Sequence, residues 1–385
     1  MGLVHRLYHG ETTFPLIRQR KKFYAVSLVL VVIGLGSMLF QGFNLGVEFK
    51  GGGILQFPVS SHVDVKASRS FVESTGVKDA IVQTVKTSTG ATQLRVETPP
   101  LTLTEQTKVE DDLAKHFNIN VNEIDSATVG PAWGKQVTKK ALQGLVVFLI
   151  AVVIYISLRF EPKMAASAII ALIHDLVLAA GVYSITRFVV TPSTVIALLT
   201  VLGYSLYDTI VVFDKVEENT RGIEKQSTLT YAEAAELAVN QTFMRSINTS
   251  LIALLPVSGL LFVGALLLGA GTLKDLALAL FVGLGSGAYS SLFLATPLLA
   301  DLKEREPRFI TLHQRVLDRR ASGKAPVRLS QHSAYATAVA GDAAVGETEV
   351  APVRASPAGA TATKRPPPKR KKGGRPGRPA GKRKR

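Results

Sequence analysis

Residues 141–158 read ALQGLVVFLIAVVIYISL, a run of eighteen residues without one charged side chain. At a rise of about 1.5 Å per residue, a helix of this length approaches the thickness of the hydrocarbon core of a bilayer. Lys139, Lys140 and Arg159 flank the run. This stretch therefore predicts a helix that crosses a membrane, and it excludes a purely soluble enzyme.

Five other apolar stretches, each bounded by charges or turn residues, predict five further spans. They lie at about 23–43, 164–186, 193–213, 249–268 and 276–300. The first follows a basic segment, as in a signal peptide. It is too long for the apolar part of a cleaved signal, and no A-x-A-like site follows it, so we interpret it as an uncleaved anchor. We therefore expect the remaining five spans within residues 136–306.

The basic residues of the loops indicate an orientation. Lysines and arginines gather before the first span and in alternate loops, whereas the short loops opposite carry only Arg187 and Lys274. Positive charges near span ends favour the cytoplasmic side of a membrane. We therefore expect residues 1–22 and the C-terminus in the cytoplasm, and residues 44–135 outside.

Residues 44–135 are long enough for one small domain. Strands are predicted at 53–59, 81–86, 92–97 and 122–129, with a turn at Ser88-Thr89-Gly90 that favours a hairpin. Helices are predicted at 64–75 and from Thr102, where Glu105 completes a capping-box spacing. This β-α-β-β-α-β order is that of a ferredoxin-like split unit. The predicted fold class is an α-helical membrane protein with six transmembrane helices and one small external α+β domain.

Two further segments are predicted to lie in the cytoplasm. Residues 214–246 are polar and then helical from 231 to 239, which indicates a loop with an amphipathic helix at the membrane surface. Residues 307–385 hold 19 Lys and Arg against four Asp and Glu, so most of the net charge of +16 belongs there. We expect 307–385 to be a disordered basic tail. Its charge suits anionic lipid or RNA, and a solvated tail without a partner is an equal alternative.

Charged side chains inside the spans are few, and each is a candidate for function because a charge in lipid is costly. His174 and Asp175 lie near the middle of the third span. Asp208 lies in the fourth span, roughly 9 Å from its cytoplasmic end at the helical rise per residue. Arg245 lies at the cytoplasmic start of the fifth.

These four residues suit a proton relay. A lone carboxylate in lipid takes up a proton, whereas a nearby guanidinium, which stays charged, favours release of that proton. Antiparallel fourth and fifth spans bring Asp208 and Arg245 to similar depths. For Asp208 and Asp175 the alternative is a static carboxylate that fixes helix packing. For His174 alone, a hydrogen-bonded packing histidine is the favoured interpretation.

Several kinds of active site are excluded by the sequence. The chain has no cysteine, so it has no thiolate nucleophile or thiolate metal site, and it contains neither HExxH nor GxSxG. Gly130 to Lys135 resembles a phosphate loop, but only three residues separate its glycines and Gln136 follows the lysine. We therefore expect no enzymatic activity, no cofactor and no bound metal.

The combined motifs resemble the SecF family. They are Gly46-Val47-Glu48-Phe49-Lys50-Gly51-Gly52 after the first span, Val129-Gly130-Pro131 before the second, His174-Asp175, the segment from Gly203 to Asp214, and the segment from Asn240 through Arg245 to Ser250. SecF is the smaller subunit of the SecD–SecF accessory complex of protein translocation, related to the resistance–nodulation–division transporters. The resemblance covers about residues 15–310.

This resemblance implies a subunit in the bacterial plasma membrane that pairs with SecD. It implies association with the Sec channel of SecY, SecE and SecG, and use of the proton gradient to help pull unfolded secretory polypeptides outward. It also implies that Asp208 and Arg245 belong to the proton pathway. In the junction motif, which includes Gly46, Phe49, Gly51 and Gly52, Glu48 replaces the usual Asp.

A second departure lies beside Asp208. Tyr207 stands where the family usually has Asn, and we expect Tyr207 and Thr209 to tune the carboxylate between them. Two other functions stay open: a proton-coupled exporter of small molecules or lipids from the same superfamily, and a purely structural scaffold for SecD. Such exporters usually combine twelve spans and large external domains in one chain, which this chain lacks.

Overall fold

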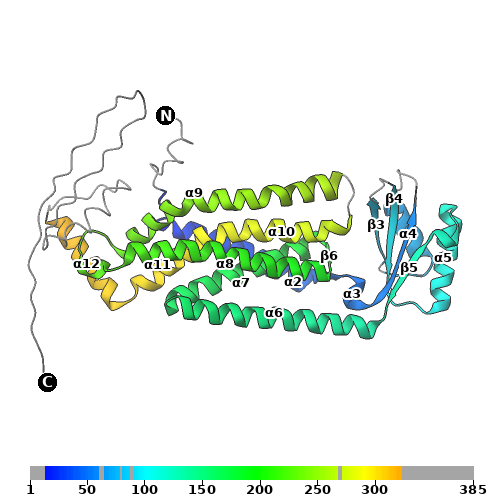
Figure 1. The fold of residues 1–385 in the computed structure, drawn as a ribbon, viewed down its shortest axis with the longest axis horizontal. Helices are drawn as coiled ribbons and strands as arrows, with labels where there is room; N and C mark the ends of the chain where they lie inside the picture. The colour runs from blue at the N-terminus through cyan, green and yellow to red at the C-terminus, as the bar shows by residue number, and fades with distance from the viewer. Residues whose placement is uncertain (1–13, 60–64, 79, 87–90, 268–270, 323–385) are drawn as a thin grey trace, which may run out of the picture. The chain divides into compact units, whose positions relative to one another are not determined.

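A computed structural model of the chain describes residues 14–59, 65–78, 80–86, 91–267 and 271–322 (Figure 1). Within these residues, six helices are long and apolar enough to cross a membrane, as predicted. They are α2 (Arg20–Gln41), α6 (Pro131–Arg159), α7 (Pro162–Thr186), α8 (Pro192–Thr220), α9 (Tyr231–Ser258) extended by η3 (Gly259–Leu267), and α10 (Gly271–Ser290) extended by η4 (Ser291–Ala295) and α11 (Thr296–Glu304).

Local sequence explains where these helices start. Proline occupies an early position in α6, α7 and α8, where the missing backbone N–H costs no hydrogen bond. Thr191 and Thr230 form capping boxes at the starts of α8 and α9. The helices α6, α7, α8 and α9 therefore begin at residues that satisfy or remove an otherwise unpaired backbone donor.

The predicted loop 214–246 is wrong in extent. Helix α8 continues to Thr220 and α9 begins at Tyr231, so residues 231–246 form the first part of the fifth spanning helix and not a separate surface helix. Ala234, Ala235 and Ala238 are buried against the bundle. Because these small side chains pack on other helices, the segment lies within the bundle despite its low hydropathy.

The predicted disorder from residue 307 is wrong for the segment that forms helix α12 (Pro307–Ala321). Phe309, Leu312 and Val316 lie on one face of α12 and are buried in the core of the bundle. Arg308 and Arg320 form ion pairs with Glu224 and Glu233, at 3.0 and 2.8 Å. Apolar spacing of three and four residues thus docks this basic helix on the bundle. Residues 323–385 lie outside the described part of the chain.

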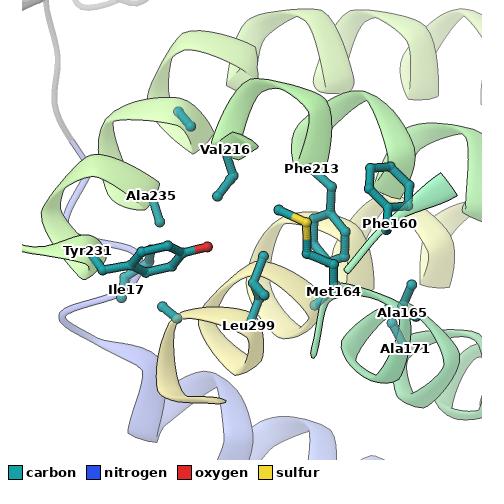
Figure 2. Close-up of a cluster of buried hydrophobic side chains, with 14 of the residues drawn as sticks. Ile17, Phe160, Met164, Ala165, Ala171, Phe213, Val216, Tyr231, Ala235 and Leu299 are labelled. Atoms are coloured by element: carbon teal, nitrogen blue, oxygen red, sulfur yellow. The ribbon is translucent and has the colours of Figure 1, made fainter. Parts of the chain in front are cut away.

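The core of this end of the bundle joins segments far apart in sequence. Figure 2 shows Phe160, Met164, Phe213, Leu299 and Tyr231 as members of one buried cluster. These side chains come from the α6–α7 turn, α7, α8, α11 and α9. The cluster therefore holds the ends of four spanning helices in one arrangement.

We expect Leu312→Ala to loosen α12. Leu312 is fully buried, and truncating a buried leucine costs about 2–5 kcal/mol. Trypsin should then cut faster after Arg315 and Arg319, which lie on the same helix. Leu317→Ala, at a half-exposed position of α12, is the matched control and should change little. Equal cleavage of the two variants would contradict docking by the buried face.

The smaller domain is a sheet covered by two helices. Its elements are β2 (Gly52–Pro58), α4 (Val65–Ser74), β3 (Ile81–Lys86), β4 (Thr92–Thr98), α5 (Leu103–Phe117) and β5 (Asp125–Val129). The strand order is β3-β4-β2-β5, and all neighbours are antiparallel. The predicted capping box of Thr102 and Glu105 is confirmed. Leu55, Leu94 and Val96 face the helices in the core.

Glycines determine the junction between this domain and α2. After α2, β1 (Asn44–Leu45) pairs in parallel with β6 (Val189–Val190), and the short helix α3 (Val47–Lys50) follows. Gly51 and Gly52 both have positive φ, 81° and 148°. A Cβ on Gly52 would lie 2.0 Å from the carbonyl oxygen of Thr98. These positions need glycine because the backbones of α3, β2 and β4 approach so closely.

Gly52→Ala is therefore expected to destabilise the small domain. The strained backbone costs about 1–3 kcal/mol, and the contact with Thr98 adds to it. Urea unfolding followed by the fluorescence of Trp133, which lies in the first turn of α6 beside the junction, measures the change. Gly76→Ala, where φ is also positive but the space is open, separates backbone strain from the clash. Similar losses in both variants would show that the contact with Thr98 adds nothing.

Candidate functional site

Small residues let α10 approach α8 closely enough to form a polar site. A Cβ on Gly283 would lie 2.3 Å from Cγ1 of Val201, and a Cβ on Gly287 would lie 2.8 Å from Cβ of Ser205. Gly285 has open space. The spacing of Gly283 and Gly287 is the small-xxx-small pattern of membrane helices. Because no side chain separates the helices there, short hydroxyl side chains of α10 can reach α7 and α8.

Asp175 lies at the centre of this contact, on α7, and only 1% of it is exposed. The Ser205 hydroxyl of α8 donates to its Oδ2 at 2.6 Å, and that of Ser290 at 2.7 Å. The Ser286 hydroxyl donates to Oδ1 at 2.6 Å. Nδ1 of His174 lies 3.1 Å from the same oxygen. Three hydroxyls from two helices therefore surround a carboxylate that has no Lys or Arg partner among the described residues.

Asp208 forms a second, similar site on α8, with 5% exposure. The Ser246 hydroxyl of α9 donates to its Oδ1 at 2.8 Å, and the Ser291 hydroxyl donates to its Oδ2 at 2.5 Å. Ser291 begins η4, a π-helical segment, and such segments are frequent at functional sites. Since Ser290 contacts Asp175 and the next residue contacts Asp208, adjacent serines connect the two carboxylates.

Arg245 does not meet Asp208 in the isolated chain. Its side chain is exposed, and no ion pair joins it to Asp208 within the residues that the structure describes. Helix α9 does reach Asp208 at the predicted depth, but through Ser246. Successive helix residues point about 100° apart, so an inward Ser246 turns Arg245 toward the outer surface of the bundle. The predicted pairing of these two residues is thus absent from this arrangement.

Of the two residues beside Asp208 in the sequence, one is exposed and the other is buried. Tyr207 is 54% exposed, and no hydrogen bond from its phenol to Asp208 exists among the described contacts. Thr209 is buried, and its hydroxyl donates to the carbonyl of Ser205 at 3.1 Å. Thr209 therefore contacts the α8 backbone beside both carboxylates, whereas Tyr207 faces outward.

His174 belongs to the Asp175 site. It is 5% exposed, its Nδ1 faces Asp175, and its Nε2 is buried with no partner among the described atoms. The Tyr289 ring stacks near its imidazole at 6.1 Å between centroids, and the Tyr289 hydroxyl donates to the Phe23 carbonyl at 3.1 Å. The imidazole thus lies next to the Asp175 carboxylate and faces the Tyr289 ring of α10, whose hydroxyl bonds the backbone of α2.

The junction motif forms a separate charged group outside the spans. Arg95 of β4 lies 3.1 Å from Glu97 and 3.8 Å from Glu48. Burial raises the pKa of Glu97 above its usual value, and the Arg95 charge opposes this. Phe49 is buried, and a Cβ on Gly134 of α6 would lie 2.8 Å from its carbonyl oxygen. The motif therefore holds α3, α6 and the sheet together.

Serines are the site residues that sequence reasoning missed. Within the described part of the chain, the hydroxyls that contact the two carboxylates come from Ser205, Ser246, Ser286, Ser290 and Ser291. A signal was present, because Ser286, Ser290 and Ser291 share a helix face with Gly283 and Gly287. Serine is common in membrane helices, however, and only the carboxylates on the neighbouring helices give these positions a role.

Comparison with known proteins identifies the family. Residues 108–305 match the family described as protein export membrane protein SecD/SecF, C-terminal. The chain belongs to the SecF family. It is 45% identical to protein translocase subunit SecF of Streptomyces coelicolor, over 83% of this chain and 85% of that one. It is 33% identical to SecF of Pseudomonas aeruginosa, over 72% and 87%.

A solved structure agrees with the SecF assignment. The crystal structure of SecDF from Thermus thermophilus, described as a translocon-associated membrane protein, matches with a TM-score of 0.67 at 32% identity. The match covers 79% of this chain and 40% of the longer SecDF chain. The chain is therefore a multi-pass membrane protein that corresponds to one part of SecDF.

Proposed function

We propose that this chain is the SecF subunit of a bacterial plasma-membrane complex that uses the proton motive force to assist protein export. The support comes from its relatives, which are named as protein translocase subunits, and from the two buried carboxylates. The observation that carries the proton part is the pair of sites at Asp208 and Asp175, inside spanning helices and contacted mainly by hydroxyls.

Hydroxyl ligands suit a carboxylate that changes its protonation state. A serine hydroxyl donates to an ionised carboxylate and can rotate to accept from a protonated one, so both states keep hydrogen bonds. A fixed Lys or Arg partner would favour the ionised state alone. Proton uptake at Asp208 then changes its hydrogen bonds to Ser246 and Ser291, and thus the contacts of α8 with α9 and η4. Moving one charge through 100 mV supplies about 2.3 kcal/mol for such a change.

SecD is the proposed partner at the outer face of α8 and α9. This face exposes Arg245 and Tyr207 within spanning helices, and an Arg facing lipid is costly. Covering by the spanning helices of SecD removes that cost. A rotation of α9 in the complex could turn Arg245 inward in place of Ser246. This rotation would bring the guanidinium to Asp208, in keeping with the relay of Asp208, Arg245, Asp175 and His174.

We place the sheet domain outside the membrane and both termini in the cytoplasm, on the loop charges and the positive-inside rule. The strand order β3-β4-β2-β5 supports our proposal that this domain is a ferredoxin-like split unit. Association with SecY, SecE and SecG and contact with unfolded secretory polypeptides complete the proposal. No chemical reaction on a substrate is part of it.

Export from cells that contain or lack this chain tests the proposal. We expect the chain to accelerate release of a secreted protein on the outer side, and a protonophore to remove this acceleration. Acceleration that persists without a proton gradient would contradict the proton part. Loss of small-molecule export in the deletion strain, with normal protein secretion, would instead favour the exporter function.

A further inference from the structure

A cavity of about 740 Å³ lies where the small domain meets the ends of the spanning helices. Ile81 and Gln83 of β3 and Glu97 of β4 line it on the sheet side. Phe188, after α7, and Lys274, on α10, line it on the helix side. Its volume falls within the range of ligand-binding sites, about 300–1,000 Å³.

One wall of this cavity is the edge of a sheet. β3 is the terminal strand of the order β3-β4-β2-β5 and pairs only with β4 among the described strands. An edge strand carries backbone N–H and C=O groups on its open side, and these can pair with another extended chain. β5, at the opposite edge, lines none of the cavities described at this junction. The two edges of the sheet thus differ in what lies beside them.

The walls of the cavity offer mixed chemistry. Lys50, Arg69, Arg187 and Lys274 contribute positive charges, and Glu97 and Asp275 contribute negative ones. Glu97 Oε2 is buried and accepts no hydrogen bond from the described residues, so a donor from a bound molecule has a place there. Apolar residues complete the lining, among them Leu45, Val47, Ile81, Phe188 and Val189.

We propose that this cavity holds an extended segment of the exported polypeptide, which adds a strand to the open edge of β3. This inference rests on the proposed role in protein export. Exported chains differ in sequence and share only their backbone, and strand addition binds through the backbone. Walls with both signs of charge and apolar surface accept varied side chains. A lipid phosphate would use the cations but would leave the β3 edge and Glu97 without partners.

Single-cysteine cross-linking tests this directly, because the natural chain has no cysteine. Gln83→Cys places a thiol at the cavity. Asp125→Cys is the matched control, because Gln83, Arg95, Gln56 and Asp125 form one cross-strand row that ends at the opposite edges. A secretory protein with one cysteine, stalled in transit by a folded domain at its C-terminus, is the probe in membranes that contain the whole complex.

We expect a strong disulfide adduct between the stalled chain and Gln83→Cys, and severalfold less with Asp125→Cys. Moving the cysteine of the stalled chain along its sequence should change the yield with a two-residue period, because alternate side chains of a strand face opposite sides. Equal yields at both edges would overturn the proposal. So would labelling of the cavity by photoactivatable phosphatidylglycerol without any adduct of the stalled chain.

The cross-linking result can be interpreted independently of whether export depends on the proton gradient. The adduct at Gln83→Cys should still form in an Asp208→Asn background, because binding at the sheet edge needs no proton. Adduct formation together with export that ignores the proton gradient would reject the proton mechanism alone. Proton-driven export without an adduct at Gln83→Cys would reject the cavity as the polypeptide site and leave the mechanism intact.

Discussion

Replacing Asp208 with Asn is expected to abolish the proton-dependent part of protein export while the chain still folds and assembles. Asn has almost the same shape and keeps polar contacts with Ser246 and Ser291, but it cannot take up or release a proton. A relay that depends on this carboxylate loses its function entirely. Export measured with and without a protonophore should then give equal rates.

Asp214→Asn is the matched control for this variant. Asp214 lies on the same helix, but its side chain is 44% exposed and paired with Arg159, so its loss should cost at most about 1 kcal/mol of stability. Asp214→Asn should export normally. Full proton-dependent export by Asp208→Asn would reduce the Asp208 site to static packing. Co-purification with SecD, unchanged in both variants, shows that assembly is not the cause.

Gly283→Ala is expected to cause the second large effect, a strong loss of both stability and export. The new Cβ would lie 2.3 Å from Cγ1 of Val201, so α10 must move away from α8. Ser286 and Ser290 move with it and leave Asp175 with fewer hydrogen-bond donors. Forcing side chains into such a contact costs about 1–3 kcal/mol before the lost hydrogen bonds are counted.

The double variant Gly283→Ala with Val201→Ala provides the test. Val201→Ala removes the Cγ atoms and leaves its Cβ 3.0 Å from the new methyl group, so stability should be partly restored. Gly285→Ala, which meets open space, should be neutral. Thermal unfolding in detergent and protein export are measured for the unaltered chain, Gly283→Ala, the double variant and Gly285→Ala. A double variant no better than Gly283→Ala would contradict the close contact of α8 and α10 as the cause.

Local patterns in the sequence were enough for most of the elements. The six spans follow from long apolar runs with few or no charged residues, and the small domain's strands and helices follow from alternation and from the Thr102–Glu105 capping box. The errors have a common origin. Residues 231–246 and 307–321 are polar or basic, so hydropathy placed them in a loop and a tail, whereas small and apolar residues on one face pack both against the bundle.

The same reasoning predicted only the titratable residues of the candidate site and not their partners. Asp175, His174 and Asp208 stand out because acidic and titratable side chains are rare within spans, and the structure buries all three. Their serine partners do not stand out, since each lies on another helix. The rotation of α9 decides between Arg245 and Ser246 at Asp208, and a pattern along one helix cannot report the rotation of a helix relative to its neighbour.

The order of residues by itself determined which segments enter the membrane, which form the sheet, and which carboxylates are costly to bury, because these depend on hydropathy and spacing along one segment. Only the tertiary structure decided which hydroxyls meet those carboxylates, which face α9 turns inward, and that a cavity lies at the open edge of β3. Those outcomes depend on how closely helices approach, and that distance is determined by side chains from different helices together.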